Sequence, residues 1–301
     1  MLGLGSNTFD PSKDIADLSG KVYVVTGGSS GIGFGIVAHL LQHNPERIYL
    51  LGKKEEHIHE AEESLKNWGD VSRITSLQIE LEDLHQTASV AKQLASLLTR
   101  LDALVLNAGL GVGVYNETKD GIDSHFQVNS SELHRLGTSN VQFADLAEIN
   151  QDAGPMVLYN HSKLAQILLA KSMVRHKKQS QLGLSPSHGP CFIATHPGGV
   201  STDQPKQAEE AYGVMGKIGV MATRPFMSDP IDQGCRPALF AATSGDVVKE
   251  GLDGVYVVPD RKVAGVSSQA EDERPQEQCL RLVEGLLGEK LRRLPYETVY
   301  D

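Results

Sequence analysis

The sequence predicts an α/β fold with a single doubly wound parallel sheet, and three observations support this prediction. Short β-branched runs alternate with segments whose apolar residues recur at helical spacing. A glycine-rich turn at Thr26–Gly33 separates the first run from the first helical segment. The 301 residues include no linker-like tract and no internal repeat, and 40% of them are hydrophobic, which favours one domain with a sizeable core.

The strands and helices are expected in strict alternation. A β-branched run that ends in glycines, at residues 21–25, is typical of a buried parallel strand. Ile32, Ile36 and Leu40 then share one helical face. Further strands are expected at 47–51, 74–79, 101–106, 191–195 and 254–258. Further helices are expected at 56–68, at 90–98, from 164 onwards and in an amphipathic stripe over 280–291.

Charge and cysteine content exclude several classes of partner. The formal net charge of -10 argues against nucleic acid or an anionic membrane surface. No stretch approaches the ~18 apolar residues of a membrane span, and no secretory signal is apparent. The three cysteines have no metal-ligand spacing, so we expect no metal site. These absences predict a cytoplasmic protein.

The glycine-rich turn is suited to a dinucleotide. A phosphate diester needs backbone N–H groups at a helix N-terminus and no side chains in its approach. Gly27, Gly31 and Gly33 lie between a predicted strand and a predicted helix, which is the context that such a site requires. An ordinary tight strand-to-helix turn is the alternative interpretation.

Two lysines follow the second predicted strand and favour NADP over NAD. Proteins that bind NAD usually carry an acid here for the ribose 2′-hydroxyl. This chain has Gly52, Lys53 and Lys54 at that place, and two ammonium groups would suit a 2′-phosphate. The alternative is that both lysines are simply solvated.

Tyr159 and Lys163 are four residues apart, so on a helix they share one face. A free phenol, with a pKa of about 10, is a poor acid–base catalyst at neutral pH. A neighbouring ammonium favours the phenolate and lowers that pKa. The tyrosine can then accept a proton from an alcohol or give one to a carbonyl.

Together, these residues resemble the short-chain dehydrogenases/reductases. The matching segments are Thr26–Gly33, Leu106–Gly109, Tyr159–Lys163 and His196–Thr202, and the resemblance extends from about Leu18 to Tyr296. Within the family, Phe126–Asn129 and Ser130–His134 are similar to the retinol-dehydrogenase-like branch, and Gly254–Glu273 is similar to light-induced alcohol dehydrogenases.

The apolar residues of 201–229 favour a lid over a lipophilic substrate, and packing in the core or in an oligomer is the alternative. The resemblance implies one Rossmann-like dinucleotide-binding domain over residues 1–301, with an N-terminal extension at 1–18. It implies an NADP-dependent oxidoreductase that interconverts an alcohol and a carbonyl on a lipophilic small molecule. Tyr159 would be the acid/base, and Lys163 would hold the nicotinamide ribose. Ser131 would bind the substrate oxygen, with Ser130 as the alternative, and Asn129 would orient a water in the proton relay. The implied cofactor contacts are Thr26, Gly27, Ser29, Ser30, Gly31, Ile32, Gly33, Lys53, Glu80, Asn107, Ala108, Gly109, Tyr159, Lys163, Pro197, Gly198, Val200 and Thr202.

One interval is shorter than the family pattern requires. Ser131 lies only 22 positions after Gly109, whereas the family places a long helix and the fifth strand in this interval, which takes about 30 residues or more. The fifth strand and half of the preceding helix are therefore predicted to be missing, with the remaining helix starting near Lys119. Either the next strand pairs with the fourth, or the centre of the sheet is poorly formed.

The short interval has two functional consequences. The affected helix usually forms the family's dimer interface, so a homodimer is possible but disfavoured. The alternative to an active oxidoreductase is a catalytically impaired dinucleotide-binding protein that lacks an internal helix–strand segment.

Overall fold

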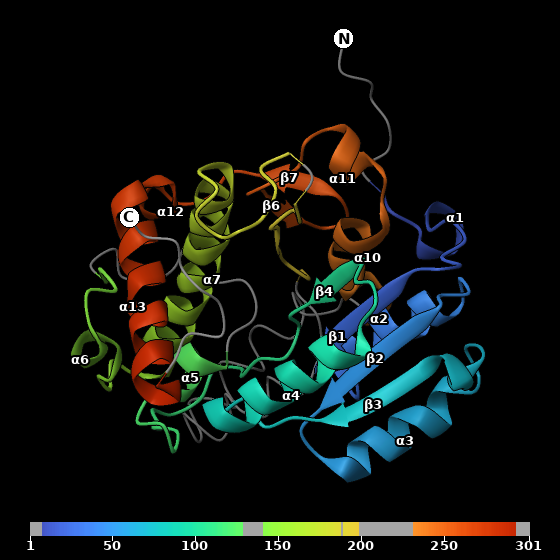
Figure 1. Cartoon of the computed structure of the whole chain (residues 1–301), viewed down its shortest axis with the longest axis horizontal. Coiled ribbons are helices and arrows are strands. Elements are labelled where there is room, and N and C mark those ends of the chain that lie inside the picture. Colours follow the sequence, from blue (N-terminus) through green and yellow to red (C-terminus); the bar gives the residue numbers. More distant parts are fainter. Residues whose placement is uncertain (1–7, 129–140, 188, 199–230, 293–301) are drawn as a thin grey trace, which may run out of the picture.

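The computed structural model describes residues 8–128, 141–187, 189–198 and 231–292 (Figure 1). Its first half contains α1 (Pro11–Asp14), β1 (Val22–Thr26), α2 (Gly31–Leu41), β2 (Arg47–Gly52), α3 (Glu55–Leu65), the 3-10 helix η1 (Val71–Arg73), β3 (Ile74–Gln78), α4 (Leu84–Leu97), β4 (Ala103–Val105), α5 (Ser124–Gln127) and α6 (Leu146–Ile149). Its second half contains α7 (Pro155–Lys178), β5 (Ala194–Thr195), α9 (Ile231–Gly234), α10 (Arg236–Thr243), α11 (Asp246–Lys249), β6 (Tyr256–Val258), β7 (Lys262–Ala264), α12 (Ser268–Glu271) and α13 (Glu273–Leu291).

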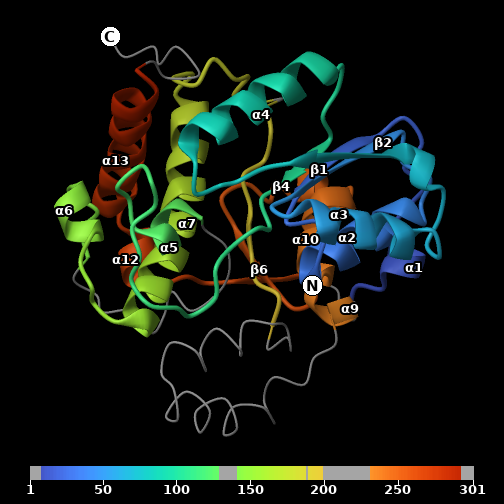
Figure 2. The same cartoon turned by 90° about the horizontal axis from the view of Figure 1, so that it is seen from below.

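The first sheet is parallel and has the strand order β3-β2-β1-β4. Figure 2 shows α4 on one side of these strands and α2, α3 and α10 on the other. This arrangement confirms the predicted α/β fold with helices on both faces. The two central strands are buried on both faces: all five residues of β1 are buried, as are five of the six residues of β2.

The remaining described strands form a second sheet. The described strands are therefore divided between two sheets, whereas a continuous doubly wound sheet would contain them all. The order of the second sheet is β5-β6-β7, with β5 parallel to β6 and the unpredicted β7 antiparallel to β6. Within the described residues, no strand lies between β4 and β5, as the short interval predicts. The suggestion that the next strand moves over to pair with the fourth is wrong, because β5 pairs with β6 and belongs to a different sheet.

The helix expected to start near Lys119 is also shorter than predicted. It begins only at Ser124, after Asp123 caps it by accepting a hydrogen bond from the N–H of Phe126, and it ends at Gln127. Lys119 instead belongs to a turn in which the Gly121 N–H donates to the Thr118 carbonyl. One turn of helix therefore remains of the family's long helix within the described residues.

Three apolar clusters hold the layers together. The largest joins both sheets, since it contains Val25 of β1, Leu239 of α10 and Val257 of β6. A second lies between α7, α13 and β6, and a third packs α4 against the other face of β1 and β2. The two sheets are thus parts of one packed structure although they share no strand pair in the described chain.

Residues 8–18 contribute to the largest core, which the sequence did not indicate. Phe9, Ile15 and Leu18 are each at most 4% exposed. The ring of Phe9 meets Phe240 edge-on at 5.8 Å, and the Phe9 N–H donates to Asp260 Oδ2 at 3.1 Å. The part of the N-terminal extension that the structure describes is therefore an integral part of the fold.

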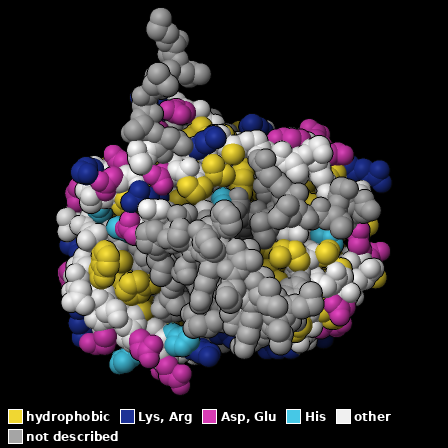
Figure 3. Space-filling model, turned by 180° about the vertical axis from the view of Figure 1, so that it is seen from behind, with side chains coloured by type: hydrophobic (Ala, Val, Ile, Leu, Met, Phe, Trp, Pro, Cys, Tyr) yellow, Lys and Arg dark blue, Asp and Glu magenta, His cyan; other side chains and the backbone are white. Residues whose placement is uncertain are grey.

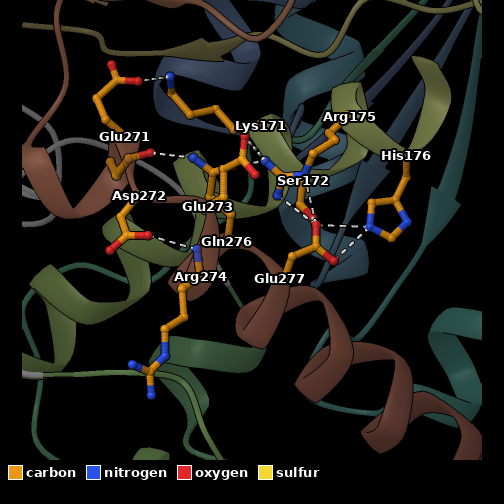
Figure 4. A network of polar contacts seen from close by, with 11 residues as sticks. Lys171, Ser172, Arg175, His176, Glu271, Asp272, Glu273, Arg274, Gln276 and Glu277 are labelled. Atoms are coloured by element: carbon orange, nitrogen blue, oxygen red, sulfur yellow. Dashed lines mark hydrogen bonds and ion pairs between the residues drawn. The ribbon is translucent and has the colours of Figure 1, made fainter. Parts of the chain in front are cut away.

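A polar network attaches α12, through Glu271, and α13, through Glu277, to α7 (Figure 4). Lys171 Nζ lies 2.7 Å from Glu271, and Arg175 Nη2 lies 2.6 Å from Glu277. The same Glu277 carboxylate approaches His176 Nε2 at 2.9 Å. The partly buried network orients α13 along α7, and α7 is the helix that carries Tyr159 and Lys163.

The surface agrees with the acidic, mixed-charge composition. On the face behind Figure 1, side chains of both charges lie around the rim and hydrophobic side chains gather in separate patches (Figure 3). No helix in the described part of the chain is both long enough and apolar enough to cross a membrane.

Candidate active site

The glycine-rich turn connects β1 to α2, as predicted. Gly27 has φ +66, and a Cβ on Gly33 would lie only 2.2 Å from the Gly27 carbonyl oxygen, so both positions require glycine. Ser30 caps α2 in an extended conformation without a side-chain hydrogen bond, and the first turn contains no acidic residue. A Cβ on Gly31, the first residue of α2, would meet no heavy atom within 4 Å, so the start of the helix has open space that suits a phosphate.

Residues after β4 pack directly onto this turn. Asn107 Nδ2 donates to the Thr26 carbonyl at 3.1 Å, and the Ala108 N–H donates to Thr26 Oγ1 at 3.0 Å. A Cβ on Gly27 would meet Ala108 at 3.1 Å. The structure thus brings together Thr26, Gly27, Gly33, Asn107 and Ala108, which the sequence placed in one dinucleotide site.

Other predicted contacts lie around the same turn. Ser29 lies beside the end of β2, since a Cβ on Gly52 would be 2.9 Å from Ser29 Oγ. Ile32 packs partly against the largest core. Gly109 follows Ala108 in the chain and is partly buried. The side chain of Ile32 is therefore structural, and its backbone is what remains available to a ligand.

Lys53 lies between two carboxylates, which the sequence did not reveal. Its Nζ is 2.9 Å from Glu80 Oε2 and 2.6 Å from Glu82 Oε2. Partial burial lowers the pKa of Lys53, but the hydrogen bonds that its ammonium donates to Glu82 and Glu80 outweigh this and raise the pKa above its ordinary value. Lys53 is therefore a cation whose charge is largely neutralised. Glu80, which is also expected to contact adenine, is one of these two carboxylates.

Tyr159 and Lys163 lie one turn apart near the start of α7, as their spacing predicts. Helix α7 begins at Pro155, whose fixed φ suits the first helical position, after Gly154 at φ +87. Tyr159 is 5% exposed and Lys163 2% exposed. Lys163 Nζ lies 4.5 Å from the centroid of the Tyr159 ring. The ammonium therefore lies over the aromatic face in a cation–π contact.

The amine of Lys163 is buried without a hydrogen-bond partner. Burial lowers the pKa of Lys163 from 10.5 to about 7, because little water reaches the charged form. A buried ammonium without acceptors is unfavourable unless a ligand supplies them. The hydroxyl groups of a nicotinamide ribose are acceptors of the required kind, so the residues present fit this cofactor.

Substituting Lys163 by Met is expected to stabilise the cofactor-free protein near pH 7. The folded-state pKa of Lys163 lies near 7 and the unfolded-state value near 10.5, so between these values the unfolded chain binds more protons and the wild type gains stability as pH rises. The variant should be more stable by on the order of 2–4 kcal/mol at pH 7, and the difference should vanish near pH 10. Urea unfolding at several pH values measures it.

The exposed Lys178, at the end of the same helix, provides the control variant Lys178→Met. Its difference from the wild type should be small and independent of pH. A Lys163→Met difference that stays constant from pH 6 to pH 10 would contradict the assigned burial cost.

The segment that follows β5 contains the described part of the predicted His196–Thr202 motif. His196 is 7% exposed and its ring stacks on Tyr256 at 6.5 Å, so it is held by packing. The Gly198 N–H donates to His196 Nδ1 at 3.3 Å, and Gly198 has φ +87. Pro197 lies between them in the resulting turn. This turn fixes the direction in which the chain leaves β5.

Several predicted site residues lie outside the described residues. These are Asn129, Ser131, Val200 and Thr202, together with the lid at 201–229. The described site residues form two groups: one in which Asn107 and Ala108 contact the glycine-rich turn, and one in which Lys163 contacts Tyr159. The catalytic and cofactor roles assigned to individual residues remain predictions.

Two buried polar residues were missed by the sequence analysis. Asn160 is 2% exposed and its Oδ1 has no hydrogen-bond partner. His125 of α5 is equally buried, neither ring nitrogen has a hydrogen-bond partner, and its Nδ1 lies 3.6 Å from Asp123 Oδ2. Each lies within or beside a motif whose other residues carry the resemblance, so nothing in the sequence marks Asn160 or His125 as buried.

Comparison with known proteins agrees with this arrangement. Residues 21–136 match the family model for short chain dehydrogenases. A protein of Neurospora crassa named as a mitochondrial oxidoreductase, bli-4, is 32% identical, with 95% of this chain and 76% of the relative covered. That alignment has 323 positions but includes only about 286 of the 301 residues, so at about 37 positions this chain has no residue.

Solved structures share the fold. A crystal structure of an uncharacterised protein from Mycobacterium paratuberculosis superposes with a TM-score of 0.70 at 19% identity, covering 97% of this chain and 100% of that one. The Pseudomonas aeruginosa RhlG/NADP active-site complex superposes with a TM-score of 0.55 at 20% identity, covering 81% and 96%. At these identities the likeness concerns the fold.

Proposed function

Because the chain belongs to the short-chain dehydrogenase/reductase family of oxidoreductases, we propose that it uses NADP to interconvert an alcohol and a carbonyl on a lipophilic small molecule. The observation that carries this proposal is the pair formed by Tyr159 and Lys163. A buried amine without a hydrogen-bond partner lies over the ring of a buried tyrosine one helical turn away. The lipophilic substrate is inferred from the apolar residues of segment 201–229, which lies outside the described residues.

The protein groups would contribute binding and proton transfer. The N–H groups at the start of α2 and the glycines of the turn would hold the pyrophosphate. Lys163 Nζ would donate hydrogen bonds to the nicotinamide ribose. These bonds would offset the free-energy cost of burying the ammonium without acceptors. A bound NADPH supplies the hydride.

Tyr159 would complete the reaction at the substrate oxygen. In the direction of reduction, its hydroxyl donates a proton to the carbonyl oxygen as the carbon receives hydride, and an alcohol forms. In the direction of oxidation, the phenolate accepts that proton. A cation over the ring stabilises the phenolate relative to the phenol, so proton transfer becomes feasible near neutral pH. The same two residues thus serve both directions.

A titration combined with a substrate screen tests the proposal. NADPH fluorescence should change on binding, and a panel of lipophilic aldehydes and ketones should oxidise bound NADPH, as followed by the loss of its absorbance. Turnover that disappears in Tyr159→Phe supports the proposal. Saturable NADPH binding without turnover of any carbonyl would instead favour a dinucleotide-binding protein that has lost catalysis.

Cofactor preference should depend on the two carboxylates at Lys53. We expect Glu82→Gln to increase the preference for NADPH over NADH by about three- to tenfold, because Lys53 then keeps only one carboxylate partner, Glu80, and more of its charge can act on a 2′-phosphate. Fluorescence titrations with both nucleotides measure the ratio of their Kd values. Glu56→Gln, at an exposed position in the first turn of α3, is the matched control. An unchanged ratio in Glu82→Gln would mean that Lys53 does not contact the phosphate.

A further inference from the structure

We propose that His125, oriented by Asp123, binds a hydroxyl group of the substrate, so that the preferred substrate is a lipophilic carbonyl compound that also carries a hydroxyl. This substrate class rests on the proposed alcohol–carbonyl chemistry and makes it more specific. Three observations support it: the unpaired atoms of two buried residues, an open space beside one of them, and the elements that border this space.

Asp123 and His125 are buried, but several of their polar atoms lack partners. Each residue is 2% exposed. Asp123 Oδ1 accepts a hydrogen bond from the N–H of Phe126 at 3.0 Å. Asp123 Oδ2 and both ring nitrogens of His125 have no hydrogen-bond partner among the described residues. Buried polar atoms in native proteins are nearly always paired, so these atoms indicate a ligand that supplies the missing hydrogen bond.

Asp123 determines which nitrogen of His125 is available to a ligand. Asp123 Oδ2 lies 3.6 Å from His125 Nδ1, which is longer than a hydrogen bond but close enough for the carboxylate to favour the tautomer with its proton on Nδ1. Nε2 of the neutral ring is then an acceptor, so the ligand must be a donor. A hydroxyl meets this requirement, and burying it costs less free energy than burying an ammonium.

An open space adjoins Nε2 of His125. A Cβ at Gly113 would lie 3.3 Å from Nε2 and 3.7 Å from Cε1 of His125. Apart from the chain neighbours of Gly113, no other heavy atom of the described residues lies within 4 Å of that point. The φ angle of Gly113 is outside the left-handed region, so its backbone does not require glycine. The missing side chain therefore leaves room for a hydroxyl oxygen beside Nε2.

One border of this space leads to the glycine-rich turn. Residues 107–113 run to it from the carboxyl end of β4, and Asn107 and Ala108 contact the turn. Ligands of parallel α/β sheets bind outside this end of the strands. The space beside His125 thus lies on the side of the sheet where a dinucleotide and its substrate are expected.

The other border leads to the helix that carries Tyr159. Helix α5, which contains His125, contacts α7. The charge of Asp123 also reaches α7: burial lowers the pKa of His161, and nearby carboxylates that include Asp123 oppose this. A substrate that spans the two helices would therefore present its carbonyl to Tyr159 and its hydroxyl to His125.

Paired substrates test this preference. Decanal is compared with decanals that carry one hydroxyl at successive carbon atoms, and NADPH oxidation by the full chain is followed by absorbance. The best hydroxylated aldehyde should have a kcat/KM at least about tenfold above that of decanal, because a site built to bind a hydroxyl discriminates against the analogue that lacks it. Similar values for all these aldehydes would overturn the proposal but leave hydride transfer intact.

Two substitutions locate the hydroxyl. Gly113→Ala places a methyl group in the space beside Nε2, and His125→Leu removes the acceptor. In each variant, the ratio of kcat/KM for the best hydroxylated aldehyde to that for decanal should fall to within about twofold of unity. Gly285→Ala, at an exposed position of α13 where a Cβ would meet nothing within 4 Å, is the control and should keep the wild-type ratio. A wild-type ratio in Gly113→Ala would overturn the proposal even if His125→Leu failed to fold.

A binding measurement separates this proposal from the proposed function. If no carbonyl is turned over, the alcohol–carbonyl assignment fails, but the hydroxyl site is still tested by calorimetric titration with decanediols that differ in the spacing of their hydroxyls. Saturable binding to the wild type that is lost in Gly113→Ala would support the site. Absence of binding, or equal binding to both proteins, would refute it.

Discussion

Replacement of Tyr159 by Phe is expected to lower kcat for carbonyl reduction by about 10²–10⁴-fold, the usual contribution of a general acid or base. Only the hydroxyl is removed, and the ring that underlies Lys163 Nζ at 4.5 Å is retained. The Kd for NADPH should therefore stay within about twofold of the wild-type value, because the cation–π contact and the packing of α7 survive. Stopped-flow measurement of NADPH oxidation separates the chemical step from binding.

Tyr115→Phe is the matched control for this experiment. Tyr115 loses the same hydroxyl, but that hydroxyl bonds Glu117 at the exposed surface. Its kcat should equal that of the wild type. A Tyr159→Phe variant with nearly normal kcat would remove Tyr159 from the reaction, and an equal fall in both variants would show a general effect on the fold.

Insertion of a helix–strand segment of about 30 residues after Asn129 is expected to raise the melting temperature by about 8–16 °C. The new strand would pair with β4, and the new helix would cover Leu104 and Leu106, which are now 51% and 65% exposed. Half of the full burial value for two leucines is about 2 kcal/mol. Backbone hydrogen bonds along β4 add about 2 kcal/mol in net terms, giving about 4 kcal/mol in all.

Thermal unfolding followed by circular dichroism measures the gain. An insert of equal length made of glycine and serine is the control and should give no increase, because it offers neither a strand nor an apolar face. Should the helix–strand insert fail to raise the melting temperature, the edge of β4 would not be a weak point of the fold.

The sequence predicted those elements that local pattern determines. The alternation of Val22–Thr26 with Gly31–Leu41 needs only strand and helix periodicity and a glycine turn, so fold class and turn were confirmed. The spacing of Tyr159 and Lys163 similarly fixes their shared helical face. The strand predicted at 191–195 comprises only Ala194–Thr195, because a strand's length depends on its neighbours and β5 pairs only with β6 among the described strands.

Features that depend on distant parts of the chain were not predictable. The pairing of Lys53 with Glu80 and Glu82 requires β2 and β3 to lie side by side, and local charge alone suggested two available lysines. The division into two sheets depends on which strands pair in the folded chain. The short interval between Gly109 and Ser131 indicates that a strand is missing, but it does not say how the remaining strands pair. The buried Asn160 and His125 likewise become visible only when α5 packs against α7.

The contact of Phe9 with Asp260 joins residues 251 positions apart. A ribosome synthesises the chain from its N-terminus, so Phe9 emerges long before Phe240 and Asp260 exist to receive it. Until then the apolar side chains of residues 8–18 must remain exposed to water or bound to a chaperone. The largest core therefore cannot be completed before residues 240–260 have been synthesised and have left the ribosome.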